Sequence, residues 1–326
     1  MPSIIQFIHP GGEHTFDSIV NNQKYKEWHT GDHRRKYSIG KGKYFSKNST
    51  QKGEMLFWCE WEPPSFVEKL PREFNEENDL VYPKYLHTPF LPPMSIVKSK
   101  YQKGAFQNTD PFIFGKNFLY SICKIDHYRC LQNLENGSLI LFGSCVKTRF
   151  VIDTVFVVKD SKPYSIPLVS NLKSLDIYSE IVLKMSGRHE KKDRRIYTGA
   201  SFDDTTDSIN NMFSFVPAVN YIDKKRRVPR FCLGEEAVKE INSYFSKWTK
   251  NKPIINDKLK QGIINNQNID IKEVCYLWKL IKEKALKGGY VLGYNFDMPL
   301  EKNIQINPIK KKKPNKTTGC SRRQGC

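Results

Sequence analysis

Two histidines and a glutamate follow directly after the first apolar run of the chain. The run covers residues 4–8, and His9-Pro10-Gly11-Gly12-Glu13-His14 comes next. A strand that runs into a Gly-Gly turn presents such side chains at a sheet edge, where imidazole and carboxylate groups can act as acid, base or ligand. We therefore expect His9, Glu13 and His14 to be catalytic. The alternative is an ordinary turn whose histidines face solvent.

A second polar segment combines aromatic rings with cations. Residues 28–36 place three adjacent cations beside a tryptophan and two imidazoles. Phosphate oxygens bind cations and bases stack on flat rings, so this composition suits a nucleic-acid groove; the alternative is a solvated basic loop. The residues expected to contact nucleic acid here are Trp28, His33, Arg34, Arg35 and Lys36.

Two glutamates alternate with bulky apolar residues in the segment 57–65. In a strand, Glu60 and Glu62 would share one face with Trp58. Carboxylates in so basic a protein either pair with arginines as part of the structure or have a raised pKa for proton transfer. Both uses stay open, and the ion pair is the commoner one.

In the segment 107–121, an aspartate is followed directly by a proline and then by a phenylalanine. Asp110-Pro111-Phe112 leads through a glycine to Ser121. A carboxylate fixed by proline can orient a water over a base stacked on the neighbouring ring. This run resembles the first motif of the uracil-DNA glycosylase superfamily. The resemblance implies that Asp110 activates water, that Phe112 packs on a flipped base and that Ser121 ends the motif.

The same segment also departs from that family. The family has longer glycine and serine spacings and a later His-Pro-Ser loop, and no such loop follows here. A second resemblance lies at 135–143, which is similar to the step before a strand in base-binding barrels of the PUA, ASCH and EVE type. That resemblance implies an aromatic-lined cavity for a modified base. Beside it, Arg149 and Asp153 are expected to form a cross-strand pair.

Two further basic runs, 188–195 and 224–230, bracket aromatic segments. Aromatic rings interleaved with cations suit a single strand or an extruded nucleotide. Phe213 and Phe215 are instead expected to plug the core beneath a loop. The additional residues expected to contact nucleic acid are Phe112, Arg194, Arg195, Arg226, Arg227 and Arg230.

The net charge favours a polyanionic partner. Lys and Arg total 53 against 34 Asp and Glu, which gives +19. A protein this basic repels itself unless it binds a polyanion, and we expect nucleic acid, with DNA favoured. The alternative explanation is an AT-rich genome, which raises the lysine content of its proteins. The eight cysteines contain no CxxC pair, so we expect no zinc site from them, and no metal or cofactor. No feature of the sequence indicates an oligomeric state.

The elements that must position these residues are strands first and helices last. Apolar runs predict strands at 4–8, 55–61, 139–143 and 150–158, the last two as a hairpin. A polar helical stretch is expected up to Trp28, and a mostly looped segment at 71–93. Apolar residues at helical spacing predict helices after Gly234 and from Val274 to the glycines at 288–289.

These elements predict an α+β fold, a mixed β-rich body with two C-terminal helices. We expect a single globular domain over 1–307, with possible boundaries near 98 and 185, and a disordered basic tail at 308–326. No apolar run is long enough to span a membrane and no secretion signal is present, so the expected location is the cytoplasm.

Together these features favour an enzyme that acts on a flipped, modified base in DNA. The most concrete form is a metal-independent N-glycosylase that leaves abasic sites. Antiviral defence against modified phage DNA is a context that suits such an enzyme. One alternative is a non-catalytic reader of modified nucleic acid, of the PUA or EVE kind. The other is a metal-dependent nuclease, for which His9, Glu13 and His14 would supply the ligands.

Overall fold

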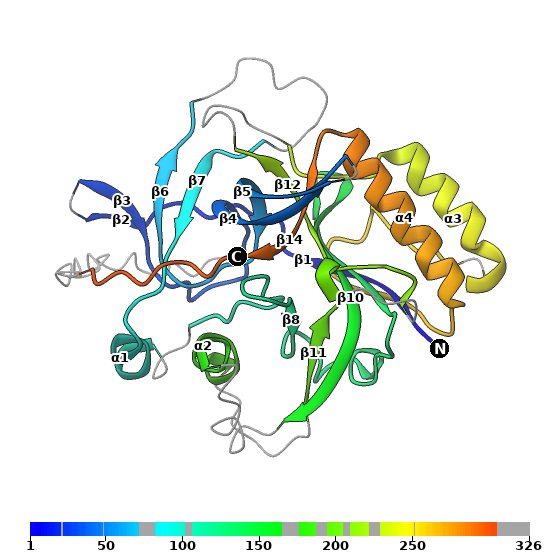
Figure 1. Ribbon diagram of the computed structural model, residues 1–326, viewed down its shortest axis with the longest axis horizontal. Coiled ribbons are helices and arrows are strands. Elements are labelled where there is room, and N and C mark those ends of the chain that lie inside the picture. Colours follow the sequence, from blue (N-terminus) through cyan, green and yellow to red (C-terminus); the bar gives the residue numbers. More distant parts are fainter. Residues whose placement is uncertain are drawn as a thin grey trace, which may run out of the picture.

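Two β-sheets form the body of the protein, as the α+β expectation requires (Figure 1). The computed structural model describes residues 1–20, 22–47, 49–71, 82–101, 106–164, 176–186, 194–204, 209–221, 229–250 and 252–304. The expected tail at 308–326 lies outside these residues. No helix among them is long and apolar enough to cross a membrane.

The first sheet is built around the N-terminal strand. β1 pairs in parallel with β9 and antiparallel with β13, and β9 forms the predicted hairpin with β10. Among the described residues this sheet has the order β13 (Gly262–Asn266), β1 (Ile4–His9), β9 (Leu139–Val146), β10 (Arg149–Tyr164), β11 (Arg194–Gly199) and β8 (Leu119–Tyr120).

The second sheet contains the long hairpin of β4 and β5. β14 pairs with both β12 and β4, and β12 pairs with β5, so four strands close into a ring. Gly42 permits the contact between β4 and β14, because a Cβ there would lie 2.2 Å from the carbonyl oxygen of Asn295. The described order is β14 (Val291–Phe296), β12 (Val216–Asn220), β5 (Ser49–Cys59), β4 (Lys36–Ser46), β7 (Tyr85–Pro89), β6 (Ser65–Lys69), β3 (Gln23–Lys26) and β2 (Ser18–Val20).

The two predicted C-terminal helices are confirmed. They lie side by side at one end of the molecule (Figure 1). Their buried stripes, such as Ile241 on α3 and Leu277 on α4, pack on one face of the first sheet. The helical segments are α1 (Met94–Ile96), η1 (Val97–Tyr101), η2 (Arg129–Leu131), α2 (Asp176–Tyr178), η5 (Ser179–Leu183), η6 (Lys184–Ser186), η7 (Phe202–Asp204), α3 (Glu235–Thr249) and α4 (Ile271–Lys287).

β1 is apolar throughout because both of its faces are covered. Ile4 and Ile8 pack toward the two long helices, whereas Ile5 and Phe7 pack into the core that joins the two sheets. Each such side chain contributes about 1.5 to 3 kcal/mol by leaving water. This double burial fixes the end of β1, and therefore His9, between the sheets.

Two sequence expectations about elements were wrong. The stretch before Trp28 is the hairpin of β2 and β3 instead of a helix, since Asn22 adopts a left-handed turn conformation with φ of 61°. A strand, β14, also follows the last helix. Of the segment expected to be mostly loop, 71–93, residues 72–81 lie outside the described residues, and the described part contains β7. Phe213 and Phe215 are buried, as expected, but they pack against Trp278 of α4.

Candidate active site

Six side chains converge where the two sheets meet, and we call them the histidine–glutamate cluster. Backbone hydrogen bonds join the loops that carry them. His14 N donates to Arg35 O at 2.9 Å, and His29 N donates to Glu62 O at 3.1 Å. The loops that precede β4 and follow β5 are thus fixed beside the turn after β1. The members of the cluster are His9, His14, His29, His33, Glu60 and Glu62.

His33 lies between the two glutamates. Its Nδ1 is 3.0 Å from Glu60 Oε1 and 3.2 Å from Glu62 Oε1, and both separations are hydrogen-bond lengths. Burial opposes the charge on this imidazole, but the two carboxylates outweigh burial and raise the pKa of His33 to about 10. Its side chain is 21% exposed and the glutamates are almost fully buried. His33 therefore presents a positive charge at the mouth of the cluster.

His14 and Glu62 face each other at a separation that is long for a hydrogen bond. His14 Nε2 is 3.5 Å from Glu62 Oε2, and within the described residues both atoms are buried without a hydrogen-bond partner. Burial lowers the pKa of His14 to about 4. Burial opposes ionisation of Glu62, but the imidazoles of His14 and His33 lower the pKa of Glu62 to about 2. A neutral imidazole thus faces an ionised carboxylate.

His29 completes this side of the cluster. Its ring meets the ring of His14 edge-on, with centroids 4.5 Å apart. Its Nε2 lies 2.6 Å from Asp32 O; because a carbonyl only accepts, Nε2 carries the proton and Nδ1 has the lone pair. One ligand atom each from His14, His29 and Glu62 lie within 4.8 Å of one another.

His9 occupies the opposite side and contacts a cysteine. Arg35 Nη2 donates to His9 Nδ1 at 2.5 Å, so His9 Nε2 carries the proton that faces Cys123 Sγ at 2.9 Å. Burial and the charge of Arg35 lower the pKa of His9 to about 4, and burial raises the pKa of Cys123. Both groups are neutral, unlike the ion pair of a nucleophilic cysteine.

A buried network of ion pairs holds Glu60 of the cluster in place. Arg35 Nη1 donates to Glu60 Oε2 at 2.6 Å and Arg35 Nε to Asp153 Oδ2 at 3.1 Å. Arg230 Nε donates to Asp153 Oδ1 at 3.1 Å. The expected pairing of Arg149 with Asp153 was therefore wrong. A register shift in β10 between residues 152 and 154 turns Asp153 toward these two buried guanidinium groups instead.

Glu13 does not join the cluster with the two histidines of its own turn. Its carboxylate accepts hydrogen bonds from Lys84 N and Tyr85 N, both at 2.9 Å. Burial raises the pKa of Glu13 to about 7, against the effect of these two donors. Of the three residues expected to be catalytic in this turn, His9 and His14 come together around the glutamates, and Glu13 binds the start of β7.

Asp110 is buried with its carboxylate turned toward backbone. Its Oδ2 accepts hydrogen bonds from Ile122 N at 2.6 Å and Cys123 N at 2.7 Å, and its Oδ1 accepts one from Ser121 N at 3.1 Å. Burial raises the pKa of Asp110 to about 7, against the effect of these donors. The ring of Phe112 is also buried. The carboxylate caps the turn that carries Cys123.

Most of the residues expected to contact nucleic acid have buried side chains with internal partners. Lys36 Nζ donates to Pro63 O at 2.8 Å, and burial lowers the pKa of Lys36 to about 7. Arg194 Nη2 donates to Asp126 at 2.7 Å. The buried members of the set are Trp28, Arg35, Lys36, Phe112, Arg194 and Arg230.

The remaining members of that set lie nearer the surface or outside the described residues. Arg34 is exposed, and His33 and Arg195 are half-buried. Arg226 and Arg227 lie outside the described residues. A phosphate that approaches the cluster would therefore meet Arg34 and His33 first.

Sequence reasoning did not bring His29 or Cys123 into the site. It did single out the two glutamates, whose alternation at the end of a strand in a basic protein was the usable signal. No pattern of spacing joins His29 to Glu62, because the link between them is a backbone hydrogen bond across 33 residues.

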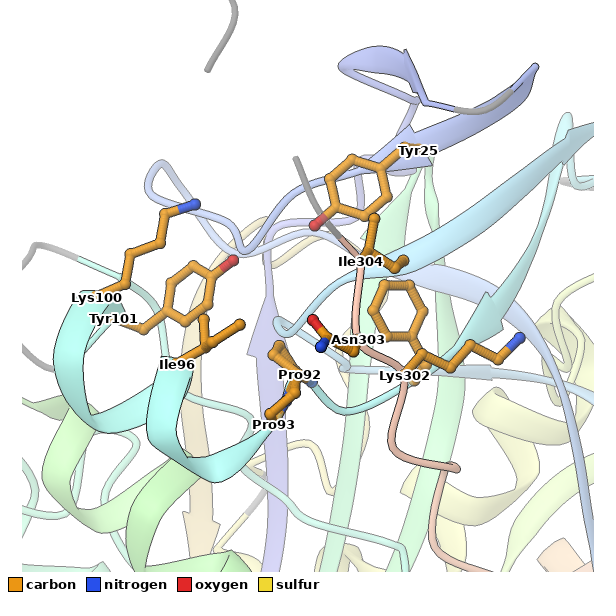
Figure 2. A pocket seen from close by; sticks show the side chains of 10 residues that line it. Tyr25, Pro92, Pro93, Ile96, Lys100, Tyr101, Lys302, Asn303 and Ile304 are labelled. Carbon is orange, nitrogen blue, oxygen red and sulfur yellow. The ribbon is translucent and has the colours of Figure 1, made fainter. Parts of the chain in front are cut away.

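A pocket of about 400 Å³ lies between η1, β3 and the segment 302–304 (Figure 2). The hydroxyl groups of Tyr25 and Tyr101 turn toward each other across it, and Pro92 and Pro93 also line it. The ring of Tyr101 packs on Trp28 with centroids 4.6 Å apart. None of the lining residues that the structure describes belongs to the histidine–glutamate cluster.

Comparison with known proteins gives no relative for this chain. No protein-family model, curated protein or solved structure matches it. The function must therefore be argued from the site itself.

Proposed function

We propose that the protein is a hydrolase that acts on nucleic acid, with the histidine–glutamate cluster as its reaction centre. The observation that carries this proposal is the unpartnered pair of His14 Nε2 and Glu62 Oε2 beside the protonated His33. A buried polar atom without a partner costs about 1 to 3 kcal/mol, and a purely structural network would pair such atoms. Active sites retain such costs because the atoms serve a substrate.

The cluster separates a base from an acid. The ionised Glu62 and the neutral His14 can accept a proton from water, and the cationic His33 can donate one. Water attacks the phosphodiester: its oxygen bonds to phosphorus while one of its protons passes to the carboxylate or imidazole. The bond from phosphorus to the leaving oxygen breaks, and that oxygen takes a proton from His33. Arg35, which Asp153 fixes in place, donates to Glu60 and thereby holds the position of His33.

The phosphodiester bond is the target that this geometry favours. The cation of His33 and the exposed Arg34 attract an anionic phosphate to the mouth of the cluster, and the net charge of +19 attracts the polymer as a whole. Asp110, the acid that a glycosylase would use, is fully engaged with backbone groups. Cleavage of the phosphodiester, the reaction of the nuclease alternative, is therefore favoured over base excision.

Base recognition remains the second candidate, and the pocket favours it. Lys100 and Lys302 line the pocket (Figure 2) and would attract the phosphate of a nucleotide. The rings of Tyr25 and Tyr101 are only 1% and 3% exposed, so they form the wall of the pocket and do not present stacking faces. In this arrangement the pocket selects the nucleotide and the cluster acts on its backbone, or the protein only reads the base.

The test compares Glu62→Gln with Glu68→Gln, a matched control whose side chain is exposed on β6. Labelled single-stranded and duplex DNA and RNA are incubated with each folded variant, and strand breaks and abasic sites are counted. We expect strand breaks from the parent and the control, and a loss on the order of 10²-fold in Glu62→Gln. Binding of all three proteins should weaken steeply with salt, because neutralised phosphates release counterions.

His33→Gln is the second variant, because His33 is half-exposed and its replacement disturbs the core less. If Glu62→Gln and His33→Gln both cleave at the rate of the parent, the assignment of the cluster as the reaction centre is wrong. Abasic sites in place of strand breaks would move the assignment to base excision. If the protein binds nucleic acid and forms no product, the non-catalytic reader of modified nucleic acid becomes the favoured function.

A further inference from the structure

We propose that His14, His29 and Glu62 bind one divalent transition-metal ion of the zinc class, with an open fourth position. The inference deepens the proposed function and depends on it for the catalytic meaning of the ion, although not for the binding itself. The metal would sit on the side of Glu62 that faces away from His33.

The separation of the facing atoms fits two ligands of one ion better than a hydrogen bond. His14 Nε2 and Glu62 Oε2 are 3.5 Å apart, whereas N–H···O hydrogen bonds are about 2.7 to 3.2 Å long. Zinc binds imidazole nitrogen and carboxylate oxygen at about 2.0 to 2.2 Å. Two ligands at tetrahedral corners of such a site are about 3.4 Å apart, as geometry requires.

Burial supplies the second, independent observation. The side chains of His14 and Glu62 are 1% and 0% exposed, and within the described residues their facing atoms have no hydrogen-bond partner. An ion between them would satisfy both atoms at once. His29 brings a third ligand atom to within 4.8 Å of the other two.

The surrounding groups orient these ligands as the outer shell of a metal site does. His29 Nε2 donates to Asp32 O at 2.6 Å, which leaves Nδ1 as the coordinating nitrogen. Glu62 Oε1 is held by His33 Nδ1 at 3.2 Å, which leaves Oε2 for the ion. Such outer contacts fix ring orientation and raise ligand basicity.

The other side of Glu62 does not need an ion. His33, Glu60 and Glu62 also place ligand atoms close together, but His33 Nδ1 already lies at hydrogen-bond distance from both carboxylates. A proton on His33 satisfies that arrangement. We therefore expect a single ion.

Three protein ligands leave a coordination position for water, and Thr30, Gly31 and Asp32 beside His29 are exposed. Zinc lowers the pKa of a bound water to about 7. That chemistry would supply the attacking oxygen for the hydrolysis proposed above.

The experiment measures metal binding without any nucleic acid. The full chain is stripped with EDTA, dialysed, and titrated with Zn²⁺ by calorimetry; Co²⁺ is then added and its visible absorption recorded. We expect one Zn²⁺ per chain and the intense visible bands of tetrahedral Co²⁺. His29→Ala, a loop variant that should fold, is expected to lose at least about 100-fold in affinity, more than an outer-shell change costs. His127→Ala, an exposed histidine elsewhere, should bind as the parent does.

Three results would overturn the proposal: a parent protein that binds no Zn²⁺, a His29→Ala protein that binds it unchanged, or binding that disappears in His33→Gln. The failures are distinguishable. If no metal binds and Glu62→Gln still abolishes cleavage, the proposed hydrolase stands without a metal. If Zn²⁺ binds at these ligands and no substrate is cleaved, the metal site stands without that function.

Discussion

Replacing Asp110 by asparagine separates a structural acid from a catalytic one. Three backbone N–H groups donate to its carboxylate, from Ser121, Ile122 and Cys123. An asparagine oxygen can take the place of Oδ2 and keep the two shorter hydrogen bonds. The amide NH₂ must then face Ser121 N, so two donors oppose each other in a buried site, and Ser121 N keeps only its longer hydrogen bond of 3.3 Å to the oxygen at Oδ2.

The expected cost follows from that single mismatch. One buried donor left without an acceptor costs about 1 to 3 kcal/mol. With an unfolding entropy of about 2.1 cal/mol/K per residue, 1 kcal/mol shifts the melting temperature of a chain this long by roughly 1.5 °C. Asp110→Asn should therefore melt about 1.5 to 4.5 °C below the parent, and Asp110→Ala, which loses every acceptor, should melt lower still.

Calorimetric melting and the cleavage assay, run on the same samples, decide the question. Asp160→Asn is the matched control, because Asp160 is exposed and its replacement should shift the melting temperature by less than about 1 °C. We expect Asp110→Asn to retain most of its activity, since the carboxylate only holds the turn that carries Cys123. An Asp110→Asn protein that melts with the parent and loses activity about 10²-fold would refute this reasoning and restore Asp110 as the catalytic acid.

Two further outcomes follow from the buried charges. In EDTA, the free energy of unfolding should fall as the pH drops from about 6.5 to 5, because burial lowers the pKa values of His9, His14 and His87 in the folded state and only the unfolded chain takes up their protons there. Glu13 and Asp110, whose pKa values burial raises to about 7, bind protons in the folded state over the same window and reduce this fall without reversing it. Each proton contributes about 1.4 kcal/mol per pH unit, and urea titrations of His87→Gln should show a slope smaller by one proton; an unchanged slope would contradict neutral burial of His87. Asp153→Asn should destabilise the fold by about 3 to 5 kcal/mol, because it leaves two buried guanidinium groups without their shared carboxylate; a melting temperature equal to that of the parent would show that Glu60 alone compensates both.

The elements whose pattern is local were predictable from the sequence. The stripes of α3 and α4 repeat at helical spacing, and the runs of β1, β9 and β10 are continuous because both faces are buried. Burial on one face or on two imposes a period on the chain, and that period can be read without knowing the partner. The hairpin of β2 and β3 was not predicted, because its residues are mostly polar and show no such period.

The candidate site was only half predictable. The sequence identified His9, His14, Glu60 and Glu62 as chemical residues, because imidazoles and carboxylates stand out at strand ends in a basic chain. It could not show that Glu62 faces His14 and that Glu60 pairs with Arg35. Those pairings depend on how the end of β1 lies against the β4–β5 hairpin.

Only the tertiary structure decided which acids are reactive and which are structural. Asp110 lies in the segment that resembles a glycosylase motif, yet its carboxylate accepts hydrogen bonds from backbone N–H groups. Glu62, in contrast, keeps one buried oxygen without a hydrogen-bond partner among the described residues. The physical reason is that the reactivity of an ionisable group depends on burial and on the donors that surround it. Those donors come from segments far away along the chain, and no local pattern of residues records them.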